Sequence, residues 1–392
     1  MKWTERSAWR KNPLYMLICL GLVILPVSNA VGQVPLYLAS VGWLVAACRG
    51  RAPVNRRTSV FLGGFALIVF ASLLYAAHPE QGMHKVNRFL IFPLAGAVTA
   101  AALKGTEPER RVFSIGMSLM AGVCLLGVYD LIRFPLEIRG GTAFEDVGNM
   151  TSPQFYLVGL MLLLGLRAYR PERLGRWFWI CLPLITTGLL LHQKRGVWLA
   201  TAATVGLWTL WSRRWKTLAV LGVAGCLALT LPFVQARLHR LQEVIQPTHG
   251  GRMILWTQVA PRILPEYPWG MGFNGSTYED FREVLPDDYH MEVGLRHLHN
   301  NFLQIRLELG WHGVVWWTLW MAAVLWIAFR PGAPGEEPLL RGAVAFAVLG
   351  LLINGLVEYN FGDSEVQKMY LVLFGLLDVF AMRRSASSSA GD

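Results

Sequence analysis

The stretch RHLHNNFLQIRLELGWHG, residues 296–313, gathers groups that could transfer a proton at the mouth of an apolar segment. If a helix starts near 299, Asn301, Gln304 and Glu308 fall on one of its faces. His299 titrates near neutrality and, when neutral, can accept a proton from a hydroxyl group. A histidine at such a boundary is more often a hydrogen-bonded polar residue than a catalyst. Spacing alone therefore leaves both interpretations of this residue open.

Metal chemistry finds little support in the sequence. His297 and His299 could supply two metal ligands, but no third candidate is apparent. The five cysteines lie inside apolar runs without CxxC spacing, which is typical of small buried hydrophobic residues. We therefore predict no metal site, no disulfide and no cofactor.

Basic residues at the ends of apolar segments favour an anion site. Lys85, Arg88, Lys194 and Arg195 lie at or inside such ends, where an unpaired charge is costly and usually functional. The forked guanidinium of Arg195 suits phosphate oxygens, and the start of a helix adds N–H groups that favour an anion. The alternative is that these side chains are paired or extend to lipid headgroups.

A second arginine comes later in the chain, within THGGRMILWTQVAPRILPEYPWGMGFNG, residues 248–275. Residues 252–263 have the pattern of a helix, with Arg252 in its first turn. The prolines and glycines between 265 and 272 then force irregular backbone. An ordinary surface helix followed by a turn explains this spacing equally well.

The elements that must position these residues are membrane helices. The chain of 392 residues is 54% hydrophobic and only 16% charged, which is typical of an integral membrane protein. A spanning helix needs about 20 mostly apolar residues. About twelve such segments are predicted, at 13–30, 33–48, 58–77, 86–103, 112–134, 153–169, 176–192, 196–212, 216–235, 300–329, 339–359 and 366–382.

The placement of Lys and Arg predicts the orientation. Most of these residues lie in short segments that share a side with the N-terminus, so both termini should be cytoplasmic. The long stretch 237–298 then forms a loop on the outer side of the membrane. We predict a single all-α transmembrane domain over 1–384 that includes this loop, followed by a disordered cytoplasmic tail over 385–392. The net charge of +11 is thus explained by topology and not by nucleic-acid binding.

Two classes of membrane protein can be compared on this pattern. A transporter or flippase for lipid-linked oligosaccharides should show pseudo-symmetric halves and polar groups near the bilayer midplane. Here the polar residues gather at one membrane face and in one loop, and Asp130 is the one acidic residue inside the first nine predicted spans. The distribution favours an enzyme.

Four stretches in this order carry a resemblance to a known family: HKVNRFLIFPL, KRGVWLA, GGRMILW…YPWGMGF and HLHNNFLQIRLELGWHGVV. The chain resembles, over roughly 80–373, the O-antigen ligase and polymerase superfamily of bacterial envelope glycosyltransferases. Within that family it looks most similar to the ligases. An O-antigen polymerase with the same chemistry is the alternative, although the loop near 136–152 is short where polymerases often carry a second sizeable loop. The protein would therefore lie in the bacterial inner membrane, with its active site facing the periplasm.

The resemblance implies a reaction and its participants. A ligase transfers a polysaccharide from undecaprenyl pyrophosphate to lipid A–core, with inversion and without metal or nucleotide. The family's catalytic residues match His299, as general base, and Arg195 and Arg252. The substrate-binding set, placed on the pyrophosphate and beside the histidine, comprises Lys85, Arg88, Lys194, Arg296, Asn300 and Asn301. The implied partners are the two lipid-linked substrates and membrane lipids, with no nucleic acid.

Overall fold

The computed structural model describes residues 12–104, 107–142, 148–232, 234–235, 251–285, 296–330 and 338–388. Within these ranges the chain is helical and contains no β-strand. The helices are α2 (Pro13–Ile24), α3 (Asn29–Cys48), α4 (Arg56–Ser72), α5 (Pro79–Met83), η1 (Val86–Ile91), α6 (Leu94–Leu103), α7 (Pro108–Arg139), α8 (Ser152–Tyr169), α9 (Pro171–Leu174), α10 (Trp177–Leu191), α11 (Arg195–Trp211), α12 (Trp215–Leu229), α14 (Gly251–Ile254), η2 (Leu255–Val259), α15 (Ala260–Glu266), α16 (Tyr278–Val284), α17 (Asn301–Phe329), α18 (Pro338–Asn354) and α19 (Ser364–Ser388).

Each predicted spanning segment contains a helix, so the all-α class is confirmed. Four helical stretches among the described residues are long and apolar enough to cross a membrane: Asn29–Cys48, Pro79–Leu103, Pro108–Arg139 and Asn301–Phe329. The other apolar helices are shorter, and the count of twelve spans stays a prediction. Helix α19 runs to Ser388, past the point where the tail was expected to begin.

The centre of the bundle is built from helices that approach closely. Helix α8 packs along α18, and α19 packs along α6. A Cβ atom on Gly165 of α8 would lie 1.9 Å from the Cβ of Ala343 on α18, so only glycine allows this contact. Large apolar side chains, including Leu67, Trp179 and Leu199, point outward and are more than half exposed. Such an apolar exterior needs lipid around it.

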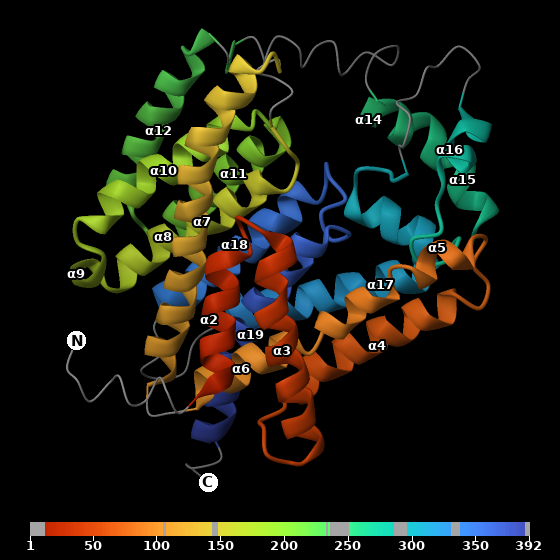
Figure 1. The fold of residues 1–392 in the computed structure, drawn as a ribbon, viewed down its shortest axis with the longest axis horizontal. Helices are drawn as coiled ribbons and strands as arrows, with labels where there is room; N and C mark the ends of the chain where they lie inside the picture. Colours follow the sequence, from red (N-terminus) through yellow and green to blue (C-terminus); the bar gives the residue numbers. More distant parts are fainter. Residues whose placement is uncertain are drawn as a thin grey trace.

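The short helices α14, α15 and α16 form a group of their own at one end of the bundle, beside α5 and the start of α17 (Figure 1). This group is part of the predicted loop 237–298, of which 237–250 and 286–295 lie outside the described residues. Leu255, Ile263 and Phe281 form a small core of their own in it, together with Leu307 from α17. The group is therefore packed onto α17 and has a fixed place relative to it.

Helix α17 is interrupted at Gly310, and the segment that follows α15 packs against this interruption. Gly310 has φ +67° and ψ −169°, far from helical values. The carbonyls of Leu307 and Glu308 accept hydrogen bonds from the N–H groups of Met271 (2.7 Å) and Gly272 (2.9 Å), where an unbroken helix would use its own N–H groups. A Cβ on Gly310 would lie 2.5 Å from the carbonyl oxygen of Trp269, so the close approach requires glycine.

Arg306, next to this break, holds the end of α15. Its guanidinium donates to the carbonyl of Tyr267 at 2.9 Å and to that of Leu264 at 3.2 Å. These carbonyls lie at the C-terminal end of α15, where helix carbonyls lack helical partners. Arg306 therefore has a structural role, and it pairs with backbone carbonyls and not with Glu308.

The predicted polar face of α17 is confirmed as a buried one, and it forms a network. The Gln304 amide accepts from the N–H of Leu298 (2.8 Å) and donates to Ser276 Oγ (3.1 Å) and to Glu308 Oε1 (2.8 Å). The Tyr359 hydroxyl donates to Glu308 Oε2 at 3.3 Å. These bonds tie the loop before α17 and the segment after α18 to one helix face. The polar residues at the mouth of this helix thus fix two loops in place.

Candidate active site

His299 occupies a constrained position directly before α17. The Asn300 side chain caps the helix by accepting from the N–H groups of Phe302 (2.8 Å) and Leu303 (3.1 Å). His299 has φ +47°, a left-handed conformation that costs a residue with a side chain some free energy. The conformation turns its imidazole toward residues 355–363 between α18 and α19, here named the 355–363 loop.

Glu358 of this loop joins two predicted catalytic residues. Its Oε1 lies 2.8 Å from His299 Nδ1, and its Oε2 accepts from Arg252 Nη2 at 2.7 Å. The side chains of His299 and Glu358 are 18% and 10% exposed, and that of Arg252 is 32% exposed. We call these three residues the His299–Glu358–Arg252 cluster.

The protonation state of Glu358 follows from these contacts. Burial acts to raise the pKa of its carboxyl group, but the His299 hydrogen bond and the positive charges around it bring that pKa below its usual value. An ionised Glu358 accepts a hydrogen bond from Nδ1–H of His299, which leaves the lone pair of Nε2 available. The cluster is therefore arranged so that His299 can take up a proton at Nε2.

His297 lies beside His299, with ring centroids 4.2 Å apart and an angle of 68° between the rings. Burial, and next the neighbouring His299, lower the pKa of His297 to about 4, so it is neutral at physiological pH. The expectation that the HxH pair has no third metal-ligand candidate is wrong, because one potential ligand atom each from His297, His299 and Glu358 lie within 4.8 Å of one another. The positive charge of Arg252 on Glu358 opposes a cation there.

The two asparagines after His299 hold the 355–363 loop against α17. Asn300 Nδ2 donates to the carbonyl of Leu356 at 2.7 Å. Asn301 is fully buried. Its backbone N–H donates to the carbonyl of Gly355 at 2.8 Å, and its Nδ2 donates to Asn360 Oδ1 at 2.8 Å. These contacts fix Glu358, which lies between the anchored positions.

Arg88 reaches the far end of the same loop. Its Nη1 donates to the carbonyl of Gly362 at 2.6 Å. Lys85 lies one turn earlier, immediately before η1, and is half-buried without an ion pair to any acid in the described ranges. Arg296 is exposed three residues before His299, and its carbonyl accepts from Ser276 Oγ at 2.7 Å.

The helix that carries the other predicted catalytic arginine also starts at this loop. Lys194 is the residue before α11, and Arg195 is the first residue of the helix. A Cβ on Gly196 would lie 2.8 Å from Cγ2 of Val357, so the first turn of α11 touches the residue next to Glu358. The 355–363 loop is thus the common neighbour of α17, η1 and the start of α11.

An apolar cavity of about 730 Å³ lies between α4 and the η1–α6 segment. Its lining includes Asn87 and Phe89, the two chain neighbours of Arg88. Along α4 the lining extends from Thr58 to Phe70, a rise of ~18 Å at ~1.5 Å per residue. The apolar lining and the length of this cavity suit a long apolar chain.

Sequence reasoning missed Glu358. The predicted span 339–359 included it, whereas α18 ends at Asn354. Helix α18 stops where Gly355 packs closely against Asn301. A Cβ atom on Gly355 would lie only 2.1 Å from Asn301 Nδ2. A lone acid at the end of an otherwise apolar run is the signal that could have identified it.

Asp363, at the end of the 355–363 loop, makes stability depend on pH. Burial, followed by the charges of Glu358 and Glu365, raises its pKa to about 7, against the lowering effect of Arg88. A raised carboxyl pKa means that the folded state holds a proton which the unfolded state releases, so stability is lost as pH rises from about 4 to about 7. We expect Asp363→Asn to melt above wild type at pH 8.

Thermal unfolding in detergent, measured for both proteins between pH 5 and pH 8, checks this expectation. The difference in melting temperature should shrink toward pH 5, where Asp363 is protonated in the folded protein. A difference that does not change with pH would contradict the assignment. His297 has a lowered pKa, so its contribution to stability increases as pH rises. This contribution is the same in both proteins and cancels in the difference of their melting temperatures.

Comparison with known families places this site in context. Residues 178–318 match the family model described as O-Antigen ligase. The matched segment includes Arg195, Arg252 and His299, whereas Glu358 lies beyond it. No curated protein matches the chain. Residues 178–318 are thus similar to the O-antigen ligase family that the motifs of the chain resemble.

Proposed function

We propose that the protein is an O-antigen ligase, which transfers a polysaccharide from undecaprenyl pyrophosphate to a sugar hydroxyl of lipid A–core. The observation that carries the proposal is the His299–Glu358–Arg252 cluster, with a histidine oriented by a carboxylate beside an arginine. The family domain around two of its members supports the same class of reaction. The proposal includes about twelve spans, cytoplasmic termini and a site at the periplasmic face of the inner membrane.

The proposed step is one displacement at the anomeric carbon. The acceptor oxygen attacks this carbon from the side opposite the pyrophosphate, and the bond to the leaving oxygen breaks with its electron pair. The hydroxyl proton passes to Nε2 of His299, whose Nδ1–H stays bonded to Glu358. The product linkage is inverted, and lipid pyrophosphate leaves. The step needs no redox partner and no covalent intermediate.

Cations of this chain would stabilise the leaving group. Arg252 gives one nitrogen to Glu358, which leaves further N–H donors of its guanidinium for phosphate oxygens. Arg195 and Lys194 lie at the start of α11, where helix N–H groups also favour an anion. Lys85 and Arg88 belong to the segment around η1, of which Asn87 and Phe89 line the apolar cavity, and we propose that the polyprenyl chain of the donor occupies this cavity. Charge stabilisation of this kind is worth several kcal/mol.

The test is a transfer assay with purified protein, undecaprenyl-pyrophosphate glycan and lipid A–core, run with and without EDTA. We expect glycan on the core acceptor at the same rate in both conditions, because Arg252 and not a metal ion neutralises Glu358. A rate that falls with EDTA and returns with an added divalent metal would contradict the metal-independent mechanism.

The acceptor identifies the reaction. Lengthening of the lipid-linked chain without transfer to core would show a polymerase and overturn the ligase assignment. Absence of transfer to either acceptor, by protein that remains monodisperse and folded, would count against both enzymes. Proteoliposomes that move the donor across the bilayer without transfer would instead show a flippase.

A further inference from the structure

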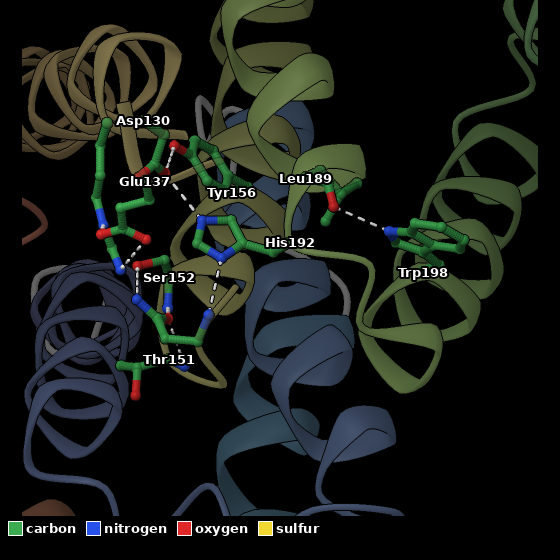
Figure 2. Close-up of polar contacts among 10 residues, drawn as sticks. Asp130, Glu137, Thr151, Ser152, Tyr156, Leu189, His192 and Trp198 are labelled. Carbon is green, nitrogen blue, oxygen red and sulfur yellow. Dashed lines mark hydrogen bonds and ion pairs between the residues drawn. The ribbon is translucent and has the colours of Figure 1, made fainter. Parts of the chain in front are cut away.

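A second buried polar network lies away from the His299–Glu358–Arg252 cluster, among α7, α8 and α10. Asp130 Oδ2 is 2.8 Å from His192 Nε2 and accepts from the Tyr156 hydroxyl at 2.6 Å. The side chains of Asp130 and His192 are both fully buried. Figure 2 shows the carboxylate of Asp130 beside Tyr156 and within reach of one side of the His192 ring. No substrate can reach groups buried in this way, so they have no direct chemical role.

The other ring nitrogen of His192 anchors a different segment. Nδ1 accepts from the backbone N–H of Asn149 at 3.2 Å, so Nε2 carries the proton that is donated to Asp130. Asn149 Oδ1 in turn accepts from the N–H groups of Thr151 and Ser152 at the start of α8. His192 thus connects α7 with the turn before α8, and both ring nitrogens are used.

The turn that follows His192 leaves little freedom. His192 ends α10, Gln193 has φ +52°, and Arg195 is already the first residue of α11. Trp198 Nε1 donates back to the carbonyl of Leu189 at 2.9 Å and closes the turn from the other side, as Figure 2 shows. The backbone of Arg195 is therefore three residues from a side chain that is fixed on both sides.

We propose that the Asp130–His192 pair is a positioning device for Arg195, and this inference rests on the proposed function. The pair fixes the end of α10. Because only the short turn with Gln193 separates α10 from α11, the position of α10 determines where α11 begins. Gly196 allows the start of α11 to pack against Val357, the residue next to Glu358. Loss of the pair should move the Arg195 guanidinium relative to the pyrophosphate while the His299–Glu358–Arg252 cluster stays intact. His192 and Asp130 are positioning residues, because they act through Arg195.

The test uses His192→Gln and Asp130→Asn, with Tyr156→Phe as the matched control. Glutamine places an amide N–H near the position of Nε2 but no acceptor at the position of Nδ1, and asparagine replaces the carboxylate of Asp130 at nearly constant shape. Tyr156→Phe removes one bond to the same carboxylate oxygen and leaves both ring nitrogens of His192 with their partners. Thermal stability should fall in all three variants, but kcat should fall, by up to about 10²-fold, only in the first two. Equal losses of kcat in the control would overturn the proposal.

Double-mutant cycles then ask whether the effect passes through Arg195. His192→Gln is combined with Arg195→Lys and, separately, with Arg252→Lys, because lysine keeps the positive charge and we expect it to retain measurable turnover. We expect less than about twofold further loss in the Arg195→Lys background and the full loss in the Arg252→Lys background, since coupled sites are not additive. Full additivity in both backgrounds would overturn the positioning role.

Hydrogen–deuterium exchange separates this inference from the proposed function, because it needs no substrate. Amides of residues 193–198 should exchange faster in His192→Gln than in wild type and Tyr156→Phe, with 299–309 unchanged. Unchanged exchange at 193–198 would overturn the inference even if the enzyme is a ligase. If the wild-type protein transfers no glycan, the proposed function fails on that result, and the exchange data still decide whether His192 orders the turn.

Discussion

His299→Ala should lower the turnover number for glycan transfer by about 10²–10⁴-fold, the usual contribution of a general base. A sugar hydroxyl is a poor nucleophile while it holds its proton, and alanine offers no acceptor at this position. The protein should still fold, because the substitution removes only the ion pair between His299 and Glu358. The measurement is kcat at saturating donor and acceptor, with melting temperature as the check on folding.

Two further variants make this result specific. Glu358→Gln keeps the shape of the side chain but removes the charge that holds Nδ1–H and stabilises the protonated ring, so kcat should fall here also. His312→Ala is the matched control, because His312 is a half-buried histidine of α17 that contacts Tyr75 and not Glu358. Near-normal turnover in His299→Ala would remove this residue as the base.

Arg252→Ala should lower kcat by about 10²–10³-fold, the typical loss when one preorganised donor to a developing negative charge is removed. The variant also leaves Glu358 with one fewer positive neighbour, although His299 still holds its other oxygen. Arg252→Lys should recover part of the rate, because it keeps the charge but not the forked donor geometry.

A nearby arginine provides the control for this second experiment. Arg262 belongs to α15, in the same short helical group, and donates to the carbonyl of Val284 at 2.7 Å. Arg262→Ala should change melting temperature more than kcat. Single-turnover transfer rates for the three variants, together with binding of undecaprenyl pyrophosphate, separate a chemical defect from weaker donor binding. A wild-type rate in Arg252→Ala would show that this arginine serves only to pair Glu358.

The sequence was sufficient to predict where helices form, because apolar runs of the right length leave the backbone few other conformations in lipid. It also identified His299 and Arg252 as candidates. It could not place Glu358, because the contacts that bring this residue to His299 join positions 59 residues apart. Local patterns carry no information on such pairings.

Helix interruptions were equally hard to predict. At the break near Gly310, the carbonyls of Leu307 and Glu308 accept hydrogen bonds from the segment that starts near 269 and not from their own helix. Such long-range hydrogen bonds can be seen only in the folded chain. The buried role of His192 was hidden for a related reason. Its partner Asp130 was noticed as an isolated acid, but nothing in the spacing of the two residues indicates that α7 and α10 place them side by side.

The interruption at Gly310 also bears on how deep the reaction lies. An unbroken α17 would be ~43 Å long at ~1.5 Å per residue, well beyond the ~30 Å thickness of a hydrocarbon core. The stretch from 311 to 329 alone would be ~28 Å long and is sufficient to cross it. On the proposed topology, the turns from 301 to 309 would lie outside the apolar layer. His299 and its neighbours can stand at headgroup level, the depth at which a lipid-borne pyrophosphate and a lipid-borne sugar can meet in water.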